Sequence, residues 1–375
     1  MVNYFLEVMD NTHIKLYPIL LPFALFYRVV IWMRNLLFDW HLLPSQQYSI
    51  PVICIGNIAV GGTGKTPLVD YLVQVLSDKY RIAVLSRGYK RKTSGYVLAD
   101  EKSRSSDIGD EACQLKQKYP HVIIAVDKNR RRGMNRLLSM SEEVRPQVVL
   151  LDDGYQHRYV KPSFSILITD YNRLYYYDRL LPAGRLREPT RAVSRADMLL
   201  VSKCPDDLSR IDSRIIEKDI NPAFHQSLFF TGISYQQLKG VFPTACYPCK
   251  IEYIQKEDEI LLVTGIANPA RLVEEIKKYS DKVSVMSFSD HHEFRKKDIA
   301  RMKTALSKMT NKRPLIICTE KDAARIRHNA YFPDEWKSHL YYLPMQVYFL
   351  FDRNEQFDNL IMKHIGLVES SKKLK

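Results

Sequence analysis

A glycine-rich turn that ends in a lysine and a threonine is the part of this sequence best suited to chemistry. The segment Gly61-Gly62-Thr63-Gly64-Lys65-Thr66 follows the apolar run 52–55 and precedes a helix-like stretch. Glycines let successive backbone N–H groups converge on a polyphosphate, and the following helix directs the positive end of its dipole at the same anion. In this setting Lys65 would reach the outer phosphates and Thr66 would bind Mg²⁺. The strict spacing of such loops fails at its first position, where Ala59 stands, yet the context favours a nucleotide site over a plain turn.

A pair of carboxylates follows a second apolar run about ninety residues later. Residues 148–151 are apolar and lead into Asp152, Asp153 and Gly154. Such a run predicts a buried parallel strand that delivers a carboxylate to the C-terminal edge of the sheet, where open α/β sheets bind ligands. Asp152 or Asp153 could hold Mg²⁺ opposite Thr66. Taken alone, the pattern is equally that of a strand followed by an Asp-Gly turn.

Four further polar groups fit a phosphoryl-transfer site. Asp110 and Glu111 begin a predicted helix, where a carboxylate could take a proton from a hydroxyl or hold Mg²⁺, although acids also cap helices. A Pro/Gly-punctuated loop carries two guanidinium groups suited to bidentate phosphate recognition. An Asp-His-His group after a strand could supply a metal ligand, a proton carrier or a sugar contact, or be an ordinary surface loop. The last group contains an arginine and a tyrosine and follows a predicted strand at the C-terminal edge of the sheet. In the order given, the four groups are Asp110-Glu111, 181–189, 290–292 and 86–89.

Composition and charge exclude several classes. The 375 residues carry a formal net charge of +14, concentrated in basic clusters at 81–104, 128–136 and 185–195. Such clusters suit phosphate groups, anionic lipid or nucleic acid. We expect no nucleic-acid partner, because no recognised nucleic-acid module accompanies them. Six cysteines form no disulfide framework, and the close pair Cys246 and Cys249 has no partner pair at zinc spacing.

The N-terminal segment is apolar but interrupted. From residue 16 to 33 the only charged residue is Arg28, while Pro18 and Pro22 break the start of the segment. This leaves fewer uninterrupted apolar residues than a membrane-spanning helix needs. A narrow polar stripe, which includes Arg28, Asn35 and Asp39, faces a wide apolar surface. We therefore predict an interfacial helix in one leaflet, with a buried packing helix and a full span as the alternatives; no signal peptide is expected.

The remaining elements alternate between strand and helix. We predict strands at 51–55, 82–86, 122–126, 147–152, 164–169 and 198–202, with helices at 66–79, 109–119 and 128–139. After Asn221-Pro222 a second group follows, with strands near 228–233, 260–264, 283–288 and 314–318 and helices near 269–279 and 296–309. The predicted fold class is α/β: a P-loop NTPase-like parallel sheet with helices on both faces, a smaller α/β C-terminal domain and an N-terminal membrane-associated helix. The expected domains are 1–47, 48–225 and 226–375.

Through these motifs, the chain resembles the tetraacyldisaccharide 4′-kinases of lipid A biosynthesis. The matching stretches run in order from about residue 51 to 325, and the N-terminal helix fits as well. In that family the first glycine of the P-loop stands earlier, at the position of Gly56, so Ala59 is no departure. The matching stretches are 56–67, 86–89, 109–111, 152–157, 181–189, 264–269, 290–292 and 319–323.

The resemblance implies an enzyme on the cytoplasmic face of the bacterial inner membrane that moves the γ-phosphate of ATP to the 4′-hydroxyl of a tetraacyl glucosamine disaccharide 1-phosphate, forming lipid IVA. It implies ATP and Mg²⁺ as cofactors, with Gly61, Gly62, Thr63, Gly64, Lys65 and Thr66 at the nucleotide. Asp110 would be the catalytic base, assisted by Lys65, and Arg185 would stabilise the transferred phosphoryl group. By the same match, Thr66, Glu111, Asp152 and Asp153 would serve the metal, and Arg87, Tyr89, Gln156 and His291 would line the lipid-sugar or nucleotide site.

Two other classes of protein fit the sequence less well. A P-loop GTPase switch would carry an [NT]-K-x-D tetrad after a strand, and the nearest candidates, at 202–206 and 319–322, both miss that spacing. A structural membrane-surface module without catalysis would leave the arginine-rich loop and the paired acids unexplained.

Overall fold

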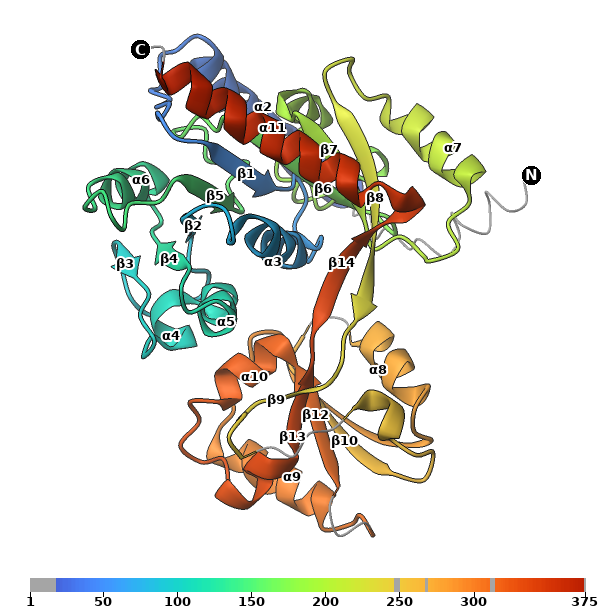
Figure 1. Ribbon diagram of the computed structural model, residues 1–375. Helices are drawn as coiled ribbons and strands as arrows, with labels where there is room; N and C mark the ends of the chain where they lie inside the picture. The colour runs from blue at the N-terminus through green and yellow to red at the C-terminus, as the bar shows by residue number, and fades with distance from the viewer. Residues whose placement is uncertain (1–17, 246–249, 267–268, 311–313, 374–375) are drawn as a thin grey trace. The chain divides into compact units, whose positions relative to one another are not determined.

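The computed structural model describes residues 18–245, 250–266, 269–310 and 314–373, so Cys246, Cys249 and the segment 1–17 lie outside the described residues. Two compact units are present. Unit 1 comprises 1–87, 122–233 and 347–375, and unit 2 comprises 88–121 and 234–346. Figure 1 shows the elements of each unit and labels most of them.

Unit 1 is built on a sheet of buried, largely parallel strands. Its strands follow the order β14-β8-β7-β6-β1-β5-β2-β4, and β1 pairs in parallel with both β5 and β6. Every residue of β1, β2, β5 and β7 is buried, which is why these strands appear in the sequence as continuous apolar runs. The strands are β1 (Val52–Gly56), β2 (Ile82–Ser86), β4 (Ile123–Val126), β5 (Val148–Asp152), β6 (Phe164–Asp170), β7 (Met198–Ser202), β8 (Ser227–Tyr235) and β14 (Met345–Phe349).

Helices connect and flank these strands (Figure 1). The long C-terminal helix α11 buries Phe357, Ile361 and Ile365, and its Asp358 accepts a hydrogen bond of 3.0 Å from the hydroxyl of Tyr71 in α3. The helices of unit 1 are η1 (Pro18–Leu20), α2 (Leu21–Asp39), α3 (Lys65–Leu76), α6 (Arg130–Leu138), η2 (Tyr175–Tyr177), η3 (Thr190–Arg195), α7 (Arg210–Ile220), η6 (Leu350–Asp352) and α11 (Asn354–Lys373).

Unit 2 contains a smaller sheet in the order β11-β10-β12-β13-β9, parallel except for β9. Alternate residues of β10 enter two separate cores: Leu261 and Val263 pack with Ile299 and Met302 of α9, whereas Leu262 packs with α8. The elements are β3 (Val97–Leu98), α4 (Ser105–Ile108), α5 (Asp110–Lys118), β9 (Lys239–Gly240), η4 (Ile251–Tyr253), β10 (Glu259–Thr264), α8 (Ala270–Lys277), β11 (Lys282–Ser287), α9 (Lys296–Leu306), β12 (Leu315–Thr319), α10 (Glu320–Ile326), η5 (Asp334–His339) and β13 (Leu340–Leu343).

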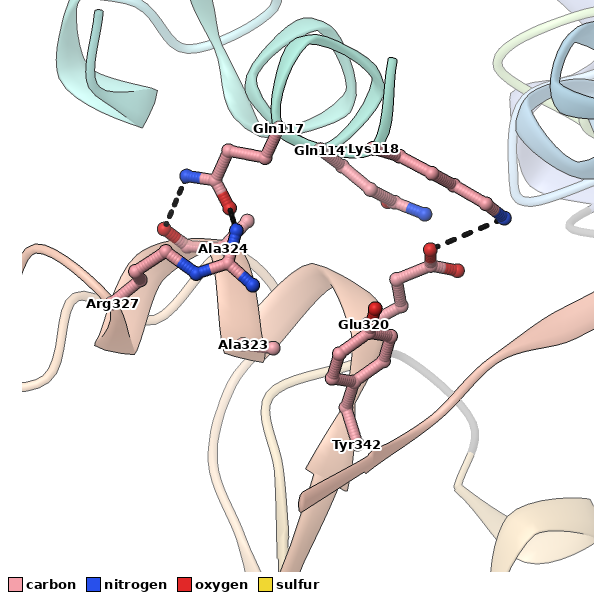
Figure 2. A pocket seen from close by; sticks show the side chains of 8 residues that line it. All are labelled: Gln114, Gln117, Lys118, Glu320, Ala323, Ala324, Arg327 and Tyr342. Atoms are coloured by element: carbon pink, nitrogen blue, oxygen red, sulfur yellow. Dashed lines mark hydrogen bonds and ion pairs between the residues drawn. The ribbon is translucent and has the colours of Figure 1, made fainter. Parts of the chain in front are cut away.

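Polar contacts attach α5 to α10 within unit 2, as Figure 2 shows. Arg327 donates a 2.8 Å hydrogen bond to the side-chain oxygen of Gln117. Lys118 of α5 forms a 3.3 Å ion pair with Glu320 of α10. Between them lies a small pocket whose lining includes Ala323, Ala324 and Tyr342. These contacts fix the register of the two helices, and with it the relation between the first residue of α5 and the last turn of α10.

The predicted fold class is confirmed, and one strand assignment is corrected. The sequence places the strand near 228–233 with the C-terminal elements, but β8 pairs in parallel with β7 in the sheet of unit 1. The crossover through α7 allows this pairing, because a helix of suitable length returns the chain to the neighbouring position in the same sheet. The contact division also differs from the expected boundaries 48–225 and 226–375, since 88–121 belongs to unit 2 and 347–375 to unit 1.

Candidate active site

The glycine-rich turn lies at the C-terminal end of the central strand β1 and leads into α3, which begins at Lys65. Gly64 has a φ of +84° and Gly61 a φ of +122°, which favours glycine at both positions. Asn57 donates a 2.7 Å hydrogen bond across the turn to the hydroxyl of Thr63, and Ser202 of β7 donates a 2.8 Å hydrogen bond to the Thr63 carbonyl. The turn is thus braced from within and from β7.

Gly56 is required by close packing at the start of this turn. A Cβ atom at this position would lie 2.6 Å from the Cβ of Tyr155, far inside a van der Waals contact. Tyr155 belongs to the turn that follows β5, so this contact brings the two sequence motifs together. This close approach therefore requires a glycine at position 56, and it does not depend on a glycine at position 59.

The arginine-rich loop runs beside the glycine-rich turn. The N–H of Val60 donates a 2.8 Å hydrogen bond to the Arg185 carbonyl, and the N–H of Arg187 donates a 2.7 Å bond to the Ile58 carbonyl. Ala59 and Leu186 form the antiparallel bridge between them. This pairing of main chains places both arginines next to the candidate phosphate site, and the Arg185 side chain is exposed there.

Asp178 holds the arginine-rich loop in shape. Its buried carboxylate accepts hydrogen bonds from the side chain of Arg173, at 2.7 and 3.0 Å, and from the N–H groups of Arg179 and Arg185. Burial alone would raise the pKa of Asp178, but these hydrogen bonds outweigh it and lower the pKa. A Cβ on Gly184 would lie 2.4 Å from the Arg179 carbonyl oxygen, so the loop closes tightly.

Asp153 is the carboxylate that meets the cations beside the glycine-rich turn. It lies 3.4 Å from Lys65 Nζ and 3.2 Å from Arg187 Nη1, and its φ of +50° turns the chain sharply after β5. Burial would raise the pKa of Asp153, but the charges of Lys65 and Arg187 outweigh it and hold the pKa below its ordinary value. Asp152, the last residue of β5, is buried.

Gln156 connects the same groups. Its side-chain amide donates a 2.6 Å hydrogen bond to the Asn57 carbonyl, and its side-chain oxygen accepts a 3.4 Å bond from Arg187. The structure therefore brings together three predicted site residues of unit 1, Lys65, Asp153 and Gln156, with Arg187, and Thr66 follows Lys65 in α3. In the sequence, the guanidinium at 187 stands out only as part of its loop.

A second basic group, missed in the sequence analysis, lies beside Asp152. Arg130 is almost completely buried, and it donates a 3.2 Å hydrogen bond to the Asp152 carbonyl. Burial lowers the pKa of Arg130 to about 10. Burial and the nearby charges of Arg130, Arg87 and Arg34 lower the pKa of His157 to about 4, so His157 is neutral at physiological pH. Arg130 gave no sequence signal beyond its place in a basic run.

In unit 2, Asp110 is the centre of an ion-pair network. It is the first residue of α5 and lies 2.5 Å from His291 Nδ1. Arg325 of α10 holds both carboxylate oxygens, at 3.0 and 2.7 Å. Burial would raise the pKa of Asp110, but His291 and Arg325 outweigh it and hold the pKa well below its usual range. The Tyr89 and His291 rings meet edge to face at 5.3 Å, so Tyr89, Asp110 and His291 come together as a group.

The opposite nitrogen of His291 faces a lysine. Lys321 Nζ lies 3.3 Å from His291 Nε2. The Asp290 carboxylate lies 3.5 Å from the same Nε2. An ammonium group can only donate a hydrogen bond, so the lysine contact requires the tautomer in which Nε2 accepts and Nδ1 donates its proton to Asp110. Arg325 is itself anchored by Asp322, at 2.8 Å, and Asp322 also accepts a 2.8 Å bond from the N–H of Gly265. The motif 319–323 thus supports the Asp110 network from within the core.

The predicted metal residues divide between the units. Thr66, Asp152 and Asp153 belong to unit 1, and Glu111, the second residue of α5, to unit 2. Within the described ranges, no three His, Cys, Asp or Glu side chains are grouped so that they could hold a metal ion by themselves. Two predicted substrate-contact residues are divided in the same way: Arg87 belongs to unit 1 and Tyr89 to unit 2.

In this parallel sheet, the central strand leads through a glycine-rich turn into a helix that begins with Lys-Thr, and an arginine-rich loop lies beside the turn. These features define a P-loop nucleotide-binding fold equipped for phosphoryl transfer. Comparisons with known proteins narrow this class. The family model described as tetraacyldisaccharide-1-P 4′-kinase, LpxK, matches residues 16–366. The chain belongs to this family and is a kinase.

Individual relatives agree with the family. The chain is 50% identical to a tetraacyldisaccharide 4′-kinase of Parabacteroides distasonis, over 95% of this chain and 96% of the relative. It is 46% identical to one of Bacteroides thetaiotaomicron, over 95% of each. Among solved structures, it resembles the "apo" form of LpxK from Aquifex aeolicus in complex with ATP, with a TM-score of 0.70 and 28% identity, over 92% of this chain and 98% of that one.

Proposed function

We propose that this protein transfers the γ-phosphate of ATP to the 4′-hydroxyl of a tetraacyl glucosamine disaccharide 1-phosphate, forming lipid IVA. Family membership and the names of its relatives support this substrate pair. The observation that carries it is the contact of Lys65 and Arg187 with one carboxylate, Asp153, beside a P-loop. Two cations at this position can stabilise phosphoryl charge as it moves between oxygens.

ATP would bind with its phosphates on the glycine-rich turn. Lys65 lies at the first position of α3, so its charge adds to the helix dipole there. When the nucleotide enters, Lys65 and Arg187 exchange part of their contact with Asp153 for contact with phosphate oxygens. The exposed guanidinium of Arg185, on the loop paired with the turn, is proposed to stabilise the transferred group.

The residues present fit Mg²⁺ held jointly with the nucleotide. This ion prefers oxygen ligands and is usually bound by one or two carboxylates, waters and substrate phosphates instead of a complete protein cage. The Thr66 hydroxyl and the carboxylates of Asp152 and Asp153 supply oxygen ligands of this kind. Glu111, the other residue predicted to serve the metal, belongs to unit 2, and its role stays a prediction. The ion would neutralise charge on the β- and γ-phosphates.

Proton removal is proposed to fall to Asp110 and His291 together. Arg325 keeps Asp110 ionised but weakens it as a base, because it lowers the carboxylate pKa. The imidazole that hydrogen-bonds this carboxylate is the usual kind of general base near neutral pH. We therefore extend the role of His291 from contact with the substrate to acceptance of the proton at Nε2, with Asp110 stabilising the imidazolium and Lys321 leaving Nε2 as the sugar hydroxyl arrives. Arg87, Tyr89 and Gln156 are proposed to contact the sugar or the nucleotide.

Helix α2 is proposed to lie in the interface of the inner membrane, on its cytoplasmic face. It is long and apolar enough to cross a membrane by length and composition alone, but one side of it hydrogen-bonds to unit 1 through Tyr27 and Arg34. The outward side exposes large apolar side chains, including Phe23 (65% exposed) and Phe26 (72%). A helix with one protein-bound face and one apolar face suits a position within one leaflet.

The activity is tested with the purified full chain, ATP labelled at the γ-phosphate, Mg²⁺ and the acylated disaccharide 1-phosphate. We expect the label to move to the lipid. Release of labelled inorganic phosphate without labelled lipid would contradict the proposal and would instead favour the nucleotide-switch alternative.

A further inference from the structure

The inner face of α2 is polar where it meets the phosphate site. The side of α2 that faces the rest of unit 1 carries residues spaced by three or four: Ala24, Tyr27, Ile31, Arg34 and Phe38. Among the described residues of α2, only Ala24 and Phe38 are buried. Two apolar side chains bury little area compared with a typical packed helix. Besides the packing of Phe38 against Tyr159, polar contacts attach α2 to the rest of unit 1.

Two of these contacts lead directly to the groups around Asp153. The hydroxyl of Tyr27 donates a 2.9 Å hydrogen bond to the Arg187 carbonyl. Arg34 Nη2 donates a 2.6 Å hydrogen bond to the Gln156 carbonyl. Arg187 and Gln156 are the residues whose side chains join Asp153, the glycine-rich turn and each other. A single helix thus holds the main chains of two separate loops at the phosphate site.

A buried carboxylate completes this attachment. Glu188, next to Arg187, is completely buried and pairs with Arg195, while Arg34 Nη1 lies 3.9 Å from its other oxygen. Burial raises the pKa of Glu188 more than these arginines lower it, and burial together with the charge of Glu188 raises the pKa of Tyr27. Loss of Arg34 would leave less positive charge near this buried acid. The charge of Arg34 thus attaches the helix to the loop electrostatically, in addition to the hydrogen bonds.

We infer that Tyr27 and Arg34 are positioning residues for phosphoryl transfer: they hold the Arg187 and Gln156 loops in register with the glycine-rich turn. The helix that presents an apolar face to lipid thereby also sets the geometry of the phosphate site. This inference rests on the proposed function. It assigns to α2 a role in turnover that is separable from membrane attachment, because Tyr27 and Arg34 lie on the inner face and the exposed apolar side chains on the outer one.

The test uses full-length Tyr27→Phe, Arg34→Gln and Arg34→Lys, with Arg28→Gln as the matched control. Arg28 lies on the same helix and is exposed, so its loss removes the same charge without touching either loop. Two quantities are measured for each variant: kcat and KM with substrate dispersed in non-ionic detergent, and binding to vesicles of phosphatidylethanolamine and phosphatidylglycerol by sedimentation. Thermal unfolding confirms that each variant is folded.

We expect Tyr27→Phe and Arg34→Gln to lower kcat by about tenfold or more, since small displacements of positioning groups can cost that much. Vesicle binding should stay at the wild-type level, Arg34→Lys should recover part of kcat because it keeps a charged donor, and Arg28→Gln should match wild type. Unchanged kcat in both Tyr27→Phe and Arg34→Gln would overturn the inference. A loss of kcat that merely parallels a loss of vesicle binding would overturn it too. If Arg34→Gln does not fold, the nearly isosteric Tyr27→Phe decides.

Failure of the proposed function can be told apart from failure of this inference. If the wild-type protein makes no phosphorylated lipid, the substrate assignment fails by itself. The inference is then decided by binding of a fluorescent ATP analogue: weaker binding in Arg34→Gln than in Arg28→Gln supports it, and equal binding overturns it.

Discussion

At the scale of the residue, each of the two candidate reaction groups is centred on one carboxylate. Asp153 is paired with Lys65 and Arg187, and Asp110 with Arg325 and His291. In both cases neighbouring hydrogen-bond donors and cations outweigh burial and lower the carboxylate pKa. The difference lies in what surrounds them: Asp153 adjoins the glycine-rich turn, and Asp110 adjoins an imidazole. The same chemical group therefore serves different proposed roles.

Lys65 is expected to be indispensable to phosphoryl transfer. We predict that Lys65→Ala lowers kcat by at least about 100-fold while the protein remains folded, because charge-stabilising groups at such sites are usually worth that much. Lys79→Ala is the control, since Lys79 is exposed beyond the C-terminal end of α3. Steady-state kinetics and thermal unfolding check both. Activity above about a tenth of wild type in Lys65→Ala would remove Lys65 from the site.

Asp110 and His291 are expected to act as one unit. We predict that Asp110→Asn and His291→Gln each lower kcat by about 100-fold, the lower range of a general base, with little change in the KM for ATP. The double variant should lose little more than either single variant, because groups that act together are strongly non-additive. Losses that multiply would show independent roles. A raised KM for ATP with kcat preserved would instead assign Asp110 to the metal.

Much of the candidate site could be predicted from sequence, because glycines, paired acids and arginines stand in short ordered motifs. Lys65, Asp153, Asp110 and His291 all lie in such motifs, and the structure gives each a charged neighbour. Arg325 could not be found this way. It follows the 319–323 motif by two residues and meets Asp110 only through the packing of α5 on α10, a contact 215 residues apart in sequence.

At the scale of the element, α2 combines two different faces. Its outer face exposes large apolar side chains to the surroundings, and its inner face forms hydrogen bonds to unit 1. Hydropathy predicted the apolar surface. Of the expected polar stripe, Asn35 accepts a hydrogen bond from Arg158 through its carbonyl and Asp39 pairs with the same arginine, while Arg28 is exposed. The inner contacts depend on loops more than a hundred residues away, which local periodicity does not report.

The outer face of α2 is expected to carry membrane binding. We predict that the double variant Phe23→Asp, Phe26→Asp lowers vesicle affinity by about 100-fold or more, since each buried phenylalanine contributes roughly 1.5–3 kcal/mol. ATP binding should be unchanged. The control is Ile211→Asp, an exposed apolar residue of α7 (71%). Vesicle sedimentation provides the measurement.

Salt distinguishes the apolar helix from the basic clusters as the means of attachment. Screening weakens interactions between exposed charges but not apolar burial, so the wild-type protein should stay on vesicles at high salt. Complete release by salt would show that the basic clusters hold the protein to anionic lipid, and that the apolar face of α2 does not.

At the scale of the whole molecule, the chain crosses between two sheets more than once. β13 and β14 are separated by a single residue, Pro344, yet β13 belongs to the sheet of unit 2 and β14 to that of unit 1. Periodicity predicted the α/β class and the strands of the central sheet, because buried parallel strands are continuous apolar runs. It did not predict that the final segment returns to the first sheet, since strand order depends on pairing partners remote in sequence.

The most direct test of the central claim is the position at which phosphate is added. The protein is incubated with Mg²⁺, ATP and either the tetraacyl disaccharide 1-phosphate or its 4′-deoxy analogue, and the products are examined by mass spectrometry and phosphorus NMR. We predict one added phosphate, bonded to the 4′-oxygen of the natural substrate, and none on the analogue. Phosphate added to the 4′-deoxy analogue, or at any other hydroxyl of the natural substrate, would contradict the account.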